Sequence, residues 1–88
     1  MPIVTLVTTG TNKENIQTVI LQGVGHGGGA RWGGVNGLKF NETANVPAGN
    51  YKATFTVPGF KNDEDVGIPA SGTLTVEDND NDYDISFA

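Results

Sequence analysis

The stretch YKATFTV, residues 51–57, decides the class of fold. Its apolar and aromatic side chains alternate with lysine and threonine at every second position: Tyr51, Ala53, Phe55 and Val57. Successive side chains of a β-strand point to opposite faces, so this period of two predicts a strand with one face on a core and one face in water. The Pro-Gly pair that follows ends the strand, because proline lacks the ladder donor and glycine adopts turn angles.

Further strands are expected on both sides of this one, and a solvated acidic loop is expected at Asn62–Asp65. Thirteen glycines and four prolines interrupt the chain, and no stretch keeps a helical spacing of apolar residues. The sequence therefore predicts one all-β domain over residues 1–88, an antiparallel two-sheet sandwich of about six or seven strands, with a small barrel as the alternative. The other expected strands are Ile3–Thr8, Ile16–Gln22 (buried on both faces), Gly37–Asn41, Thr73–Glu77 and Tyr83–Phe87.

Composition limits the classes of partner. The chain has no cysteine, and ten acidic residues against five basic ones give a net charge of −5. The basic residues are scattered, which disfavours nucleic acid and anionic membranes as partners because both are bound through clustered cations. No charged and apolar leader precedes the first expected strand, so we expect no secretion signal and a place in the cytoplasm or in a virion.

Three short segments of the second half resemble a known group of modules. They are VPAGNY (46–51), FTVPGF (55–60) and GTLTV (72–76). This order of a turn, a tyrosine-led strand, a Pro-Gly turn and a closing strand is similar to prealbumin-like and immunoglobulin-like sandwich modules, including carboxypeptidase regulatory-like and Cna-B-like domains. The resemblance implies a docking or spacer module without catalysis. Such modules recur as accessory proteins on bacteriophage capsids and tails.

The segment from Gly23 to Gly37 is the most unusual in composition, since eight of its fifteen residues are glycine. Its first six residues fit G-x-G-x-x-G, but no helix can follow to hold a pyrophosphate. His26, Arg31 and Trp32 are its side chains suited to directional recognition, and Trp and Arg are enriched at binding hot spots. One hypothesis is a loop that contacts a protein partner through these three residues. The other is that Trp32 fills the core and His26 is an ordinary exposed loop residue.

A second candidate site is the acidic run of residues 77–84. Five carboxylates in eight residues repel one another, and bound Ca²⁺, which takes 6–8 oxygen ligands, would relieve that repulsion. The run has the D-x-D-x-D opening of an EF-hand loop but lacks its glycine and its final glutamate. It also resembles the calcium loop of small bacterial fucose- and mannose-binding lectins. The alternative is a solvated hairpin turn. The candidate calcium ligands are Glu77, Asp78, Asp80, Asp82 and Asp84.

These observations favour a binding or assembly role. One histidine, two serines and no cysteine leave little material for nucleophilic catalysis, so we expect no enzyme and no obligatory cofactor. The leading hypothesis is a structural subunit, such as a small virion decoration or accessory protein, which docks on a larger assembly or associates with itself. The alternative is a calcium-dependent carbohydrate-binding protein. A spacer module of an adhesin-like protein is a third possibility.

Overall fold

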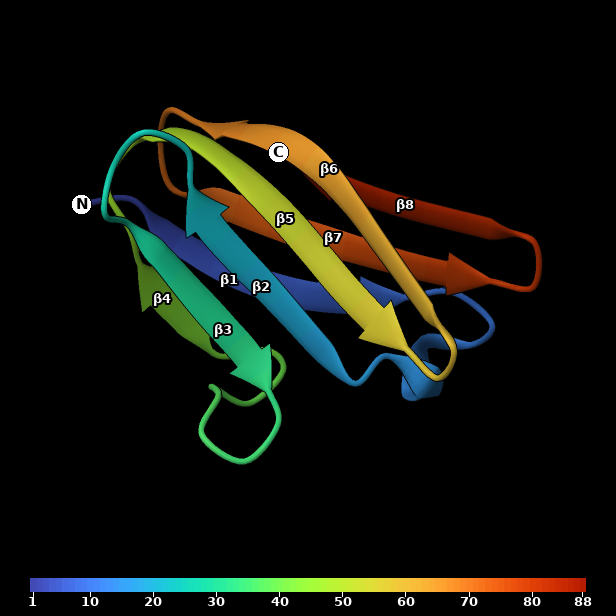
Figure 1. The fold of residues 1–88 in the computed structure, drawn as a ribbon. Helices are drawn as coiled ribbons and strands as arrows, with labels where there is room; N and C mark the ends of the chain where they lie inside the picture. Colours follow the sequence, from blue (N-terminus) through green and yellow to red (C-terminus); the bar gives the residue numbers. More distant parts are fainter.

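Eight strands form two four-stranded sheets in the computed structural model, which describes residues 1–88. Sheet A has the strand order β4-β1-β7-β8 and sheet B the order β3-β2-β5-β6 (Figure 1). One short 3₁₀ helix, η1 (Lys13–Asn15), lies between the first two strands. The strands are β1 (Ile3–Thr9), β2 (Thr18–Gly23), β3 (Gly29–Gly33), β4 (Thr43–Asn45), β5 (Gly49–Val57), β6 (Phe60–Ile68), β7 (Gly72–Asn79) and β8 (Asp82–Phe87).

The all-β two-sheet prediction is confirmed, and the sheets are not closed into a barrel. One pair of strands departs from the antiparallel expectation. β1 pairs with β7 in parallel, in a register that aligns Thr5 with Thr73 and Val7 with Thr75. β1 is therefore an inner strand of sheet A, between β7 and the three-residue β4. This parallel pairing decides which side chains share the outer face of sheet A.

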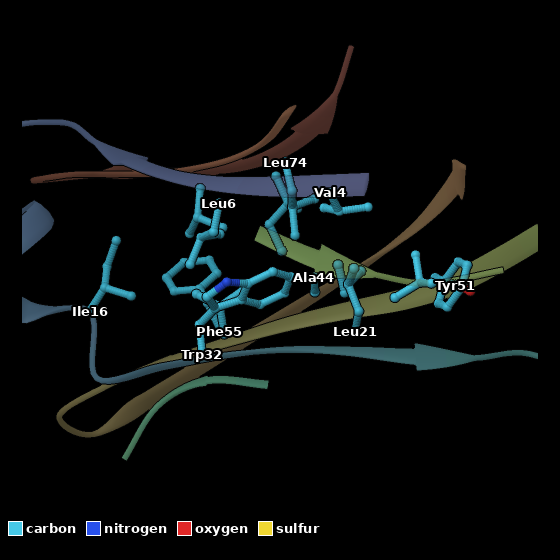
Figure 2. Close-up of a cluster of buried hydrophobic side chains, with 14 of the residues drawn as sticks. Val4, Leu6, Ile16, Leu21, Trp32, Ala44, Tyr51, Phe55 and Leu74 are labelled. Atoms are coloured by element: carbon cyan, nitrogen blue, oxygen red, sulfur yellow. The ribbon is translucent and has the colours of Figure 1, made fainter. Parts of the chain in front are cut away.

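Alternate residues of the strands build one continuous core between the sheets (Figure 2). Tyr51, Ala53 and Phe55 of β5 are fully buried, as their period of two predicts. Leu74 and Val76 of β7, in the opposite sheet, are also fully buried. The largest buried side chains are Trp32, Tyr51, Phe55, Leu6, Leu21, Ile68 and Leu74.

Three local expectations were wrong. The acidic stretch Asn62–Asp65 is not a loop, because it lies within β6, an edge strand whose exposed side tolerates charge. The glycine-rich segment is not one loop, because β3 crosses it and pairs with β2. The expected strand Gly37–Asn41 is reduced to a single bridge between Leu38 and Trp32, and β4 forms farther along the chain.

The second expected strand begins later than Ile16 and is buried on one face only. Val19 and Leu21 of β2 point into the core, whereas Ile20 is 36% exposed on the outer face of sheet B. Ile16 precedes the strand and is buried after η1. No helix of the structure has the length and apolar character needed to span a membrane.

Candidate interaction surfaces

The loop between β2 and β3 is held by its histidine. The Gly28 N–H donates to His26 Nδ1 at 3.2 Å, so the ring proton lies on Nε2, which donates to the Asn50 carbonyl at 3.1 Å. The His26 ring also meets Tyr51 edge-on, with centroids 4.9 Å apart. His26 is exposed, as one sequence hypothesis held, but its ring nitrogens are both bonded within the chain.

Two glycines make room for this ring. A Cβ at Gly23 would lie 2.6 Å from His26 Cε1, and a Cβ at Gly49 would lie 2.7 Å from Nε2. Such separations do not occur between real atoms, so larger residues at these positions would displace the imidazole. Part of the high glycine content of the segment therefore serves to seat His26 against the end of β5.

Trp32 belongs to the core rather than to a contact surface. Its side chain has no exposed area, and its indole Nε1–H donates to the Glu42 carbonyl at 3.0 Å. Figure 2 shows the indole beside Phe55, beneath Leu6. The hypothesis that Trp32 contacts a partner is corrected, because a fully buried ring cannot reach one in this fold. Truncation of the Trp32 side chain is therefore expected to lower the free energy of unfolding, and not only to affect binding.

Arg31 is exposed, but it is not joined to His26 in one patch. It precedes Trp32 on β3 and therefore points to the opposite face, the outer side of sheet B. It lies across from Ile20 in the strand register. Its guanidinium reaches the next loop, where a Cβ at Gly34 would lie 2.7 Å from a terminal nitrogen. The three predicted contact residues thus occupy a loop, an outer face and the core.

The acidic run forms the end of the β7–β8 hairpin and does not gather into a ligand set. No group of three or more acidic or histidine side chains that could hold a metal ion is present in the structure. Glu77 and Asp84 pair across the outer face of sheet A, whereas Asp78 points inward. Asp80 lies in the turn, and Asp82 begins β8.

Polar residues of this hairpin have structural partners instead. The Asn12 side-chain amide donates to Asp80 Oδ1 at 2.7 Å, and the Thr11 N–H donates to Asn79 Oδ1 at 3.0 Å. Asn12 also donates its backbone N–H to the Asp78 carbonyl at 2.9 Å. These bonds tie the hairpin to the turn between β1 and η1, so the acidic run anchors two loops to each other.

Asp78 is the one buried ionisable carboxyl, with 3% of its surface exposed. It follows Leu74 and Val76 on the inward side of β7, at the end of the core. Burial raises the pKa of its carboxyl above the ordinary value, and the nearby Asp80 charge raises it further. No side-chain oxygen of the structure is both buried and without a hydrogen-bond partner, so the Asp78 carboxylate reaches water at the end of the core.

A hollow of about 280 Å³ lies beside the loop that His26 holds. Its lining residues include Val24 from the loop, Asn50 from β5, and Val66 and Gly67 from β6. A second hollow shares Asn50 and Gly67 with it and extends toward Pro69. Asp65 and Tyr51 are the ionisable residues in the two linings, and Tyr51 is buried with a raised pKa.

The outer face of sheet A is the surface that sequence reasoning missed. Its rows are Asn45–Ile3 on β4 and β1, Thr43–Thr5–Thr73 on β4, β1 and β7, and Val7–Thr75–Ser86 on β1, β7 and β8. None of these side chains is charged; charge begins at the next row with Glu77 and Asp84. We call this surface the threonine face, and it comprises Ile3, Thr5, Val7, Thr43, Asn45, Thr73, Thr75 and Ser86.

The outer face of sheet B provides the contrast. Its rows carry charge on three of the four strands, and Lys52 forms an exposed ion pair with Asp63 at 3.4 Å. Three successive rows without a charged side chain are therefore particular to sheet A in this acidic chain. The outward-facing Thr5 and Val7 of β1 and Thr73 and Thr75 of β7 lie in separate parts of the sequence, and only the parallel β1–β7 register joins them. The charged residues on the outer face of sheet B are Arg31, Lys52, Lys61, Asp63 and Asp65.

Comparison of the chain with protein-family profiles, with curated proteins and with solved structures gives no match.

Proposed function

We propose that this protein is a non-enzymatic structural subunit that docks on a neighbouring protein through the threonine face. The observation that carries the proposal is the absence of charged side chains over three rows of sheet A, in a chain with a net charge of −5. Burying an unpaired charge is costly, and the cores of protein interfaces are depleted in charged residues. The threonine face is the broad surface of this molecule that can be covered without burying a charge.

The larger assembly that we propose is a virion, with the chain as a capsid or tail decoration or accessory subunit. This part of the proposal rests on the resemblance of roughly residues 38–88 to prealbumin-like and immunoglobulin-like modules, and on the small size of the domain. The acidic net charge also favours a protein partner over nucleic acid or an anionic membrane. We place the subunit in the virion or in the cytoplasm before assembly.

The calcium-dependent lectin alternative gains no support from the contacts of the acidic run. Calcium needs several oxygen ligands that converge on one point. Glu77 and Asp78 point to opposite faces of β7, and Asp80 is bonded to Asn12. We therefore propose no cofactor for the docking role.

A pair of matched lysine substitutions tests the docking role. Thr75 and Thr54 are both half-buried threonines that point outward from the middle of an inner strand, Thr75 on sheet A and Thr54 on sheet B. The tagged protein would be isolated under mild conditions from the organism that encodes it, and its sedimentation would be measured. We expect the wild type and Thr54→Lys to travel with a large particle and Thr75→Lys to travel as a free subunit.

Two results would contradict the docking role. One is a wild-type protein that sediments only as a free subunit of its own mass. The other is equal behaviour of Thr75→Lys and Thr54→Lys in the particle fraction. Thermal melts of both variants serve as the control for folding, because a half-buried lysine can also reduce stability.

A further inference from the structure

The threonine face has properties that narrow the choice of partner. Its centre is the row Thr43–Thr5–Thr73, flanked by Ile3 on one side and by Val7 and Thr75 on the other. Ile3 is 46% exposed, which is high for a large apolar residue within a strand. The acidic residues Glu77 and Asp84 lie beyond Thr75, at one end of the same sheet. The face is therefore uncharged at its centre and asymmetric in charge along the strands.

We propose, building on the docking role above, that the partner across the threonine face is a second copy of this chain. The two copies are related by a two-fold axis that passes close to Thr5 and Thr73. Closed two-fold pairs are the commonest oligomers, and in them the same patch must complement itself. An uncharged patch meets this condition, because no like charges meet across the two-fold axis.

The position of the axis follows from the rows. A two-fold rotation about the central row reverses the strand direction, so it places Ile3 of one copy over Val7 and Thr75 of the other. The exposed isoleucine is then covered by a methyl-bearing surface. The same rotation carries the acidic row, with Glu77 and Asp84, to opposite ends of the pair. Both acidic rows extend past the contact into solvent, where water and salt screen them.

The size of the face sets the strength of the contact. With strands about 4.8 Å apart and rows about 6.7 Å apart, the eight positions of the threonine face cover roughly 260 Å². A standard protein interface buries about 800 Å² per partner, so the face supports a weak and reversible pair. In an assembly that holds neighbouring copies close, effective concentrations reach the millimolar range, and such a contact then forms.

Analytical ultracentrifugation of the purified full chain tests the pairing. We expect the weight-average mass of the wild type to rise from monomer toward dimer between about 10 µM and 1 mM, in keeping with an interface of about a third of the standard area. Thr54→Lys, on the outer face of sheet B, should associate like the wild type. Thr5→Lys should remain a monomer, because the two-fold axis brings two lysines together.

A mixing experiment separates the contact from any loss of fold. Thr5→Glu should also be monomeric alone, but an equimolar mixture of Thr5→Lys and Thr5→Glu should associate at least as strongly as the wild type. That rescue requires residue 5 of one copy to lie near residue 5 of the other. A wild type that stays monomeric at 1 mM, or a mixture that stays monomeric while the wild type associates, would overturn the proposed pair.

The outcome also separates this inference from the docking role. If the purified chain does not self-associate but Thr75→Lys still leaves the particle fraction, the threonine face binds a different protein and only the second-copy partner is wrong. If lysine on the threonine face changes neither the self-association of the purified chain nor its sedimentation with the particle, both proposals fail.

Discussion

At the scale of single residues, Asp78 is the clearest case of a side chain whose charge does not suit its inward-facing position. Its position after Leu74 and Val76 on β7 directs a carboxyl into the end of the core. Burial raises the pKa of Asp78 in the folded state, so between its ordinary pKa and the raised value the folded protein binds more protons than the unfolded chain. Stability conferred by the protonated form is therefore lost as pH rises through that window.

The Asp78→Asn variant tests this cost. The asparagine amide has a similar shape and carries no charge at pH 7, so we expect the Asp78→Asn variant to melt at a higher temperature than the wild type. At a pH below the ordinary carboxyl pKa the difference should shrink toward zero. A lower melting temperature of Asp78→Asn at pH 7 would show that the carboxylate has a stabilising partner.

His26 gives a second prediction at this scale. His26→Ala removes two hydrogen bonds to the backbone and the contact with Tyr51, each bond contributing about 0.5–1.5 kcal/mol. We expect amide hydrogen exchange in residues 24–28 to become faster, with little change in the strands of sheet A. Arg31→Ala, which removes an exposed side chain from the next strand, should leave this exchange unchanged. Equal protection of the loop in His26→Ala would rule out the holding role of the histidine.

At the scale of elements, the edges of the two sheets meet where β6 passes β8. The Glu64 carboxylate of β6 accepts a hydrogen bond from the Ile85 N–H of β8 at 3.3 Å, and the Phe60 ring stacks on Tyr83 at 4.2 Å. The acidic residues of β6 therefore do more than keep the surface soluble, because Glu64 accepts a hydrogen bond from a backbone N–H on the edge of the other sheet. Free edge donors invite pairing with other chains.

Glu64→Ala is expected to expose that donor. The Ile85 amide should exchange faster, and the free energy of unfolding should fall by roughly 1 kcal/mol, as for the loss of one hydrogen bond. Asp65→Ala changes the charge of β6 by the same amount without touching Ile85, so it separates the hydrogen bond from the charge. If both variants change the Ile85 exchange rate equally, the contact with Glu64 is not what protects the edge.

The elements also show how far the sequence could be interpreted. The strand β5 follows from its period of two, and most of β7 and β8 follows from the same signal, although β7 extends past the expected Glu77 to Asn79. β6 was missed because an edge strand buries few side chains, so its acids look like those of a loop. β3 was missed because only Trp32 and Ala30 point inward between glycines. The pairing of Trp32 with Val19 is a long-range fact that no local pattern contains.

At the scale of the whole molecule, charge is distributed unevenly between the outer faces. Sheet B carries mixed charge, both loop-bearing ends carry ionisable residues, and the threonine face carries none over its three rows. The candidate site could not be predicted from the sequence, because it depends on the parallel pairing of residues 4–9 with residues 72–77. Of the predicted contact residues, Trp32 instead organises the core, and His26 holds a loop.

The central claim is that the threonine face is the docking surface, and site-specific photo-crosslinking tests it most directly. A photoreactive amino acid would replace Thr75 in one variant and Thr54 in another, and both would be irradiated within the native particle. We expect position 75 to crosslink to a protein of the same particle, identified by mass spectrometry, and position 54 to remain uncrosslinked. Crosslinks from position 54 alone, or equal yields from both positions, would contradict the claim.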